Sequence, residues 1–112
     1  MKKIVLAEQP VEMLNPNVSR KLVRGERLEF IEYRYRGGAR FPVHTHPSEQ
    51  LTIVVRGRLT FTTPGATELT LEAGEAVLIP PNEPHGAFVP EEVEGTVTYN
   101  VFTPVRTELP GG

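Results

Sequence analysis

The hydrophobic pattern of the chain consists of short runs of β-forming residues separated by turns. The longest run, Arg27–Arg36, is rich in aromatic and branched residues, and its apolar positions change from even to odd numbers near Ile31. A β-bulge or burial on both faces would explain that change. Thr67–Glu72 alternates regularly, with Leu69 and Leu71 on one face. No segment shows an apolar stripe at helical spacing, so the pattern predicts a protein built of strands.

Turn residues divide this pattern into short strands. Eleven prolines and ten glycines stand between the runs and do not gather in one block, which is typical of an all-β sandwich or barrel. A chain of 112 residues fits one domain, residues 1–112. We expect strands at residues 2–7, 21–24, 27–36, 40–46, 50–55, 58–63, 67–72, 75–79, 85–89 and 96–103, with loops over residues 8–19 and 104–112.

Composition and charge argue against several kinds of partner. Apolar residues make up 38% of the chain and charged residues 23%, a balance that indicates a folded domain and not a disordered one. The formal net charge is −2 and no basic stripe stands out, so nucleic acid is not an expected partner. The apolar run Ile4–Ala7 is too short for a signal-peptide core or a membrane span, so we expect a cytoplasmic protein. The absence of cysteine removes disulfides, thiolate ligands and a cysteine nucleophile.

The three histidines are the main indication of chemistry. His44 and His46 are two residues apart, and alternate residues of a strand point to the same side, so both imidazoles can face one interior point. Gln50 has the same parity, although a proline intervenes, and a loop could bring it inward equally well. His85 begins a later strand, which a barrel can bring beside the first pair. Taken singly, these residues have plainer interpretations as surface histidines, a core histidine and a solvated glutamine.

Two spaced motifs surround these residues. The first runs Gly38, five residues, His44-Thr45-His46, three residues, Gln50, six residues, Gly57, and the second runs Gly74, five residues, Pro80, four residues, His85. This spacing resembles the two sequence motifs of the cupin superfamily. The resemblance implies an all-β single-domain cupin, a double-stranded β-helix or jelly-roll barrel, with its metal-binding motifs within residues 38–89. It also implies one divalent metal ion bound by His44, His46, Gln50 and His85, with Mn, Fe, Ni and Zn as candidates.

Three positions depart from the family pattern. Gln50 stands where cupins usually have Glu, and the neighbouring Glu49 points to the opposite face if the strand is regular. Asn82 replaces a usual Gly, and Asn tolerates a positive φ better than most residues. Val89 stands in the place of the family's late Asn. Because an amide replaces a carboxylate, the implied ligand set is neutral, and the metal keeps its full charge toward an anionic ligand.

The end of the chain resembles the D-x-F-x-P-x-R close of small cupins of the pectin-degradation (KdgF) type. Those proteins are similar in length, bind their metal through three His and a Gln, and convert unsaturated uronic acids into linear keto sugars. The resemblance implies that Asn100, Phe102 and Arg106 line the substrate site, with Asn100 and Arg106 as candidate catalytic residues and Arg106 holding a substrate carboxylate. Asn100 stands where that pattern has Asp, and an amide cannot transfer protons at ordinary pH. The plainer interpretations are a core role for Phe102 and a solvated arginine.

Three functions stay open on this evidence. The first is an enzyme that acts on a small sugar acid or keto acid by metal-assisted proton transfer or isomerisation. The second is a metal-dependent dioxygenase, which oxygen uptake by iron-loaded protein would reveal. The third is a non-catalytic module that binds a small ligand and would retain metal without turnover. Apolar residues on both faces of the 50–55 strand, where Leu51, Ile53 and Val55 oppose Thr52 and Val54, also predict a homodimer.

Overall fold

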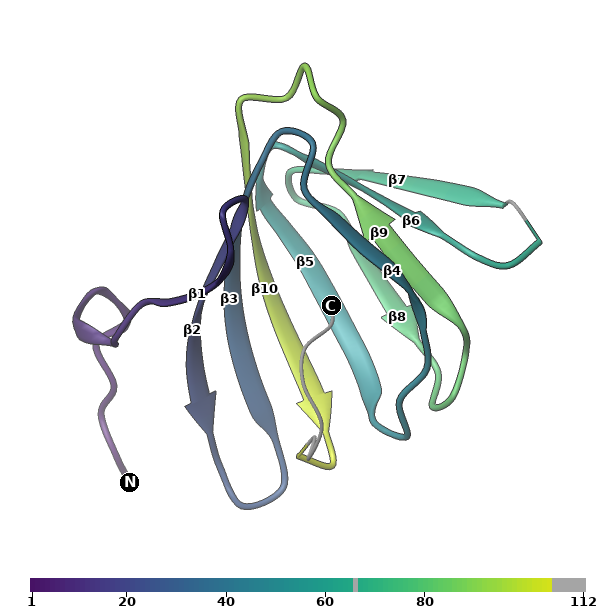
Figure 1. Ribbon diagram of the computed structural model, residues 1–112. Helices are drawn as coiled ribbons and strands as arrows, with labels where there is room; N and C mark the ends of the chain where they lie inside the picture. The colour runs from purple at the N-terminus through teal and green to yellow at the C-terminus, as the bar shows by residue number, and fades with distance from the viewer. Residues whose placement is uncertain (66, 106–112) are drawn as a thin grey trace.

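The computed structural model describes residues 1–65 and 67–105, which form ten strands in two antiparallel sheets (Figure 1). The prediction of an all-β fold is confirmed. One sheet has the order β1-β2-β3-β10-β5-β8 and the other the order β4-β9-β6-β7. The elements are η1 (Leu6–Glu8, a 3-10 turn), β1 (Glu12–Asn15), β2 (Val18–Arg24), β3 (Glu29–Arg36), β4 (Arg40–His44), β5 (Glu49–Arg56), β6 (Arg58–Thr62), β7 (Glu68–Glu72), β8 (Ala76–Ile79), β9 (His85–Phe88) and β10 (Gly95–Thr103).

The core lies between the two sheets. Ile31, Tyr33 and Tyr35 of β3 point inward and are buried, as the alternation of a strand requires. The ring centroids of Tyr33 and Tyr35 lie 5.6 and 5.9 Å from that of Phe41, which belongs to the opposite sheet. Edge-on aromatic contacts of this kind join the sheets more strongly than burial alone.

The other face of β3 is also covered. β3 pairs with β2 and β10 without a register shift, so no bulge interrupts it. Glu32 is buried, and Phe30 is half-buried with its ring centroid 5.4 Å from that of Tyr99. Burial on both faces is therefore the reason for the change of apolar phase near Ile31.

The N-terminal region differs from its prediction in two places. Residues 2–7, expected as a strand, contain no strand, and the last two of them belong to the 3-10 turn η1. The reason is that the sheet ends at β1, so this segment pairs with no neighbouring strand. Residues 8–19, expected as a loop, contain β1 and the start of β2, because Asn15, Pro16 and Asn17 serve the turn of a hairpin. Over the described ranges, no helix is long and apolar enough to cross a membrane.

Two local features bring the predicted motifs together at one end of the barrel, where β4 ends and β5 and β9 begin (Figure 1). Asn82, in the turn before β9, has a φ of 65°, and its N–H donates to the His46 carbonyl oxygen at 2.9 Å. Gly86 lies against β4, and a Cβ at this position would come within 2.9 Å of the Phe41 carbonyl oxygen. The missing side chain therefore lets β9 approach β4 beside the histidines.

Candidate metal centre

Three histidines converge at this end of the barrel. His44 ends β4, His85 begins β9, and the two are partners across the strand pair. Ring centroids lie 4.6 Å apart for His44 and His85, 5.0 Å for His46 and His85, and 5.6 Å for His44 and His46. One nitrogen of each ring lies within 4.8 Å of the other two. The structure thus brings the three predicted histidines together in a set that could hold a metal ion.

Each imidazole is oriented by a backbone carbonyl group two residues away. A carbonyl oxygen can only accept, so this contact favours the tautomer of His44 and His85 that carries its proton on Nδ1 and its lone pair on Nε2. In His46, Nδ1 also lies 2.9 Å from Ser48 Oγ and Nε2 lies 2.9 Å from Gln50 Oε1, so a metal ion at Nε2 would select the same tautomer there. Metal-binding histidines in proteins are held in the same way by hydrogen bonds from the other ring nitrogen. The Nδ1 atoms of His44, His46 and His85 lie 2.9, 2.9 and 2.8 Å from the carbonyl oxygens of Pro42, Ser48 and Glu83.

Gln50 lies beside the histidines at the start of β5. Its side chain is fully buried, whereas Glu49 is exposed, as the predicted alternation requires. The Oε1 atom of Gln50 is 2.9 Å from Nε2 of His46. Two atoms that coordinate one ion at about 2.1 Å lie roughly 3 to 3.4 Å apart, which is close to this separation. Three imidazole nitrogens and an amide oxygen fit a divalent ion of the Mn, Fe, Ni or Zn kind.

A chain of buried hydrogen bonds runs inward from Gln50. The Nε2 group of Gln50 donates to Thr52 Oγ1 at 2.9 Å, and Thr52 Oγ1 donates to Asn100 Oδ1 at 2.7 Å. The Nδ2 group of Asn100 donates to the Ile31 carbonyl oxygen at 3.1 Å and to Thr98 Oγ1 at 2.9 Å. Because the Ile31 carbonyl oxygen can only accept, the Asn100 amide turns its N–H group toward Ile31 and its oxygen toward Thr52. The Thr52 hydroxyl group donates to that oxygen and therefore accepts from the Gln50 amide N–H, which leaves the Gln50 amide oxygen facing the histidines.

The series of hydrogen bonds that begins at Gln50 ends at Tyr35, whose hydroxyl group is 3.3 Å from Thr98 Oγ1. Burial raises the pKa of the Tyr35 phenol well above its usual value, while the hydrogen bond with Thr98 acts in the opposite direction. The phenol is therefore neutral at physiological pH. Every side chain in this series of hydrogen bonds is then uncharged, so the series orients its polar groups without adding a buried charge.

The residues predicted to line the substrate site have different surroundings. Phe102 is fully buried, and its ring centroid is 5.7 Å from that of His46. Asn100 is also buried and lies two residues before Phe102 in β10, opposite Thr52, with its amide engaged in the hydrogen bonds described above. Arg106 lies outside the described residues.

Glu29 is a buried carboxylate near this site that the hydrophobic pattern did not single out. It is opposite Phe102 in the β3–β10 pair, and Phe102 is opposite Gln50 in the β10–β5 pair, so the three share one level of the inward face. Its Oε2 atom accepts hydrogen bonds from Nε and Nη2 of Arg24 at 3.0 and 2.5 Å. The sequence did offer an indication of its burial, because Glu29 has the same odd parity as the buried Ile31, Tyr33 and Tyr35 of β3.

Comparison with known proteins agrees with this geometry. The family model of the cupin domain matches residues 31–102, which is more than half of the chain. The chain belongs to the cupin family. The predicted cupin fold is thereby confirmed, while a search of curated protein sequences finds no significant match.

Several solved structures resemble this cupin over most of its length. KdgF from a Halomonas species is 24% identical, with 96% of each chain covered and a TM-score of 0.85. The polyketide cyclase RemF from Streptomyces resistomycificus is 19% identical, with 99% of this chain and 84% of that chain covered and a TM-score of 0.84. A cupin-like protein from Thermotoga maritima is 26% identical, with 88% and 79% covered and a TM-score of 0.75. The predicted likeness to KdgF-type cupins is confirmed at the level of the fold.

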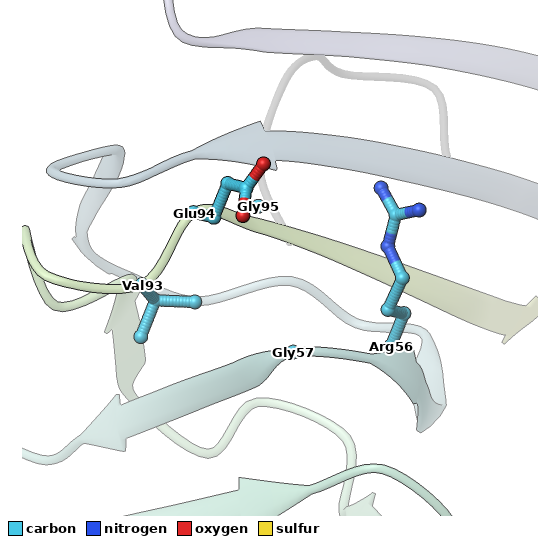
Figure 2. Close-up of a pocket in the computed structure, with 5 residues that line it drawn as sticks. All are labelled: Arg56, Gly57, Val93, Glu94 and Gly95. Atoms are coloured by element: carbon cyan, nitrogen blue, oxygen red, sulfur yellow. The ribbon is translucent and has the colours of Figure 1, made fainter.

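A hollow of about 470 Å³ lies at the opposite end of this cupin, where β5 ends and β10 begins (Figure 2). It is lined by Arg56, Gly57 and residues 93–95. Two of the lining residues are glycines, and the backbone segments approach closely here, because a Cβ on Gly57 would come within 2.3 Å of the Gly95 carbonyl oxygen. Since Gln50 is the second residue of β5 and Arg56 is the last, this hollow is separate from the histidine site.

Proposed function

We propose that this cupin binds one divalent metal ion through His44, His46, His85 and Gln50, and uses it on a small anionic substrate. The observation that carries this proposal is the convergence of three imidazoles that are each oriented by a backbone carbonyl group. When bound, the ion would supply Lewis-acid chemistry toward a carbonyl or carboxylate oxygen. The substrate class is a sugar acid or a keto acid, and the reaction is proton transfer or isomerisation next to the carbonyl group.

The charge of the site supports an anionic substrate. Three neutral imidazoles and one amide add no negative charge, so the ligands do not neutralise the divalent cation and it attracts an anionic substrate with its full charge. Phe102 packs against His46, and both side chains are buried, so water is excluded from this side of the site. Electrostatic attraction is stronger where water is excluded.

Asn100 has a positioning role in this proposal. Its amide donates to the Ile31 carbonyl oxygen and accepts from Thr52, and Thr52 in turn accepts from Gln50. Asp at this position would place a carboxylate oxygen against the carbonyl oxygen, where an amide N–H is needed. Asn100, which stands where the KdgF pattern has Asp, therefore helps to orient Gln50 and does not transfer protons.

The proposal is tested on purified protein, first by elemental analysis and then by a proton-transfer assay. Metal-loaded protein is incubated in D₂O with unsaturated galacturonate and with 2-oxobutanoate, and ¹H NMR follows conversion and exchange at the carbon next to the carbonyl group. We expect metal-dependent conversion or exchange in the wild type and in Thr45→Ala, a change at an exposed position between two of the histidines. His85→Ala should lose both the metal and the reaction.

Two results would contradict the proposal. One is a protein that retains its metal and yet transforms neither compound faster than the free ion does. The other is oxygen consumption by iron-loaded protein on these compounds, which would indicate a dioxygenase instead.

We also propose that the protein is a homodimer that associates through the outer face of the six-stranded sheet. Ile53 and Val55 of β5 and Leu78 of β8 are exposed on this sheet, at 36%, 43% and 62% of their full accessible area. Adjacent exposed apolar side chains of this kind often mark protein–protein contacts.

A further inference from the structure

A cavity of about 260 Å³ adjoins His85, between the β6–β7 hairpin and β8. β7 and β8 are the last strands of their respective sheets, so the cavity lies where the two sheets part. Its walls are largely apolar and include Phe61, Leu69, Val77 and Ile79.

The cavity adjoins the proposed metal centre, because His85 lines the cavity and also belongs to the histidine set. The His85 ring centroid is 4.6 and 5.0 Å from those of the other two histidines, and 6.3 Å from that of Phe61 on the cavity side. A molecule that is bound at the histidine nitrogens therefore needs only a short extension to reach the cavity. The cavity is large enough for a ring, since an apolar protein cavity of about 150 Å³ can bind benzene.

The polar groups of the cavity do not suit a sugar acid. Glu68 and Glu83 are its charged lining residues, both are exposed, and neither attracts a carboxylate. Three threonines supply the neutral polar groups, while the rest of the wall is apolar. A polyhydroxylated molecule would lose hydrogen bonds to water against such a wall, whereas an apolar group would gain from burial.

We infer that the ligand of the metal centre carries an apolar group, a phenyl ring or a branched alkyl chain, that enters the cavity beside His85. This inference rests on the proposed function and narrows it. The substrate is then a keto acid, or a related molecule that binds metal through two oxygens, with an apolar side chain. A sugar acid does not satisfy the cavity.

A matched pair of chelators tests the inference independently of any turnover. Acetohydroxamate and benzohydroxamate bind a metal through the same two oxygens, but one carries a methyl group and the other a phenyl ring. Each is titrated into the cobalt(II)-loaded protein, and the visible absorption of the cobalt reports binding. We expect benzohydroxamate to bind roughly 30-fold more tightly, because most of its ring is buried in the cavity.

Two leucine variants then locate the preference. Leu69→Ser changes the cavity wall and should reduce the preference for benzohydroxamate at least roughly threefold while leaving acetohydroxamate binding unchanged. Leu28→Ser is the matched control, since Leu28 is exposed to the same extent as Leu69, at 49%, but lies outside the cavity. This variant should prefer benzohydroxamate as strongly as the wild type does.

The outcomes separate this inference from the proposed function. Cobalt binding with equal affinities for the two hydroxamates, or a preference that Leu69→Ser does not change, overturns the inference alone. Failure to bind cobalt overturns the metal centre, and the inference falls with it.

Discussion

Replacing Thr52 by valine would test the hydrogen-bond chain behind Gln50. Valine has nearly the shape of threonine but lacks the hydroxyl group that accepts from Gln50 at 2.9 Å and donates to Asn100 at 2.7 Å. Thr52 is fully buried, so water does not readily replace that group. The change therefore leaves one amide N–H and one amide oxygen unsatisfied without opening a cavity.

Two separate magnitudes follow from these contacts. An unsatisfied buried polar group costs about 1–3 kcal/mol, so the two groups together should lower the free energy of unfolding of the metal-free protein by about 2–6 kcal/mol. The Gln50 amide also loses the contact that directs its oxygen toward the histidines. Removing a group that orients a metal ligand typically reduces metal affinity 10- to 100-fold, and we expect a loss of about that size.

Urea unfolding of the metal-free protein gives the first quantity, and zinc competition with a chromophoric chelator gives the second. Thr52→Ser keeps the hydroxyl group and should recover most of the metal affinity. Thr98→Val removes a hydroxyl group that is farther from Gln50 in the series of hydrogen bonds. This variant should therefore be less stable but keep a zinc affinity within about threefold of the wild type.

The reasoning is wrong if Thr52→Val binds zinc as tightly as the wild type. It is equally wrong if Thr98→Val loses as much zinc affinity as Thr52→Val, because general destabilisation would then explain both losses.

Four other predictions concern the metal, the buried chain and the outer sheet. Zinc at about 100 times its dissociation constant should stabilise the fold by about 2.7 kcal/mol, and excess EDTA should abolish this gain in scanning calorimetry. Asn100→Asp should lower the free energy of unfolding in urea by about 1–3 kcal/mol and restore no proton transfer, because a carboxylate oxygen then faces the backbone carbonyl oxygen of β3. Burial raises the pKa of Tyr35, so its contribution to stability is complete below about pH 10 and falls as the pH rises further. Urea unfolding between about pH 8 and 11 should show this loss in the wild type and in Tyr99→Phe, but a smaller one in Tyr35→Phe. Light scattering should find a dimer for the wild type and for Val43→Glu on the other sheet, and a monomer for Ile53→Glu.

The sequence by itself determined the class of fold and the histidine set. Both depend on local spacing: alternation places His44 and His46 on one side of an extended segment, and turn residues delimit the strands. The parity of Gln50 likewise predicted its burial, which the structure shows. These features need only the period of a strand and the chemistry of the side chains.

The surroundings of the histidines were decided by the tertiary structure. Thr52 and Asn100 are 48 residues apart, and Glu29 reaches the level of Gln50 only through the pairing of β10 with both β3 and β5. The cavity beside His85 likewise combines walls from β6, β7 and β8.

The N-terminal segment also shows that a local pattern alone does not determine a strand. Residues 2–7 have a strand-like pattern but form no strand, because no neighbouring strand pairs with them. A strand is completed by hydrogen bonds to another segment, and the period of side chains along one segment does not specify which segment that is or in what register it pairs. For this reason the proposed metal ligands could be predicted from local spacing, whereas the hydrogen bonds that orient Gln50 and the shape of the adjoining cavity could not.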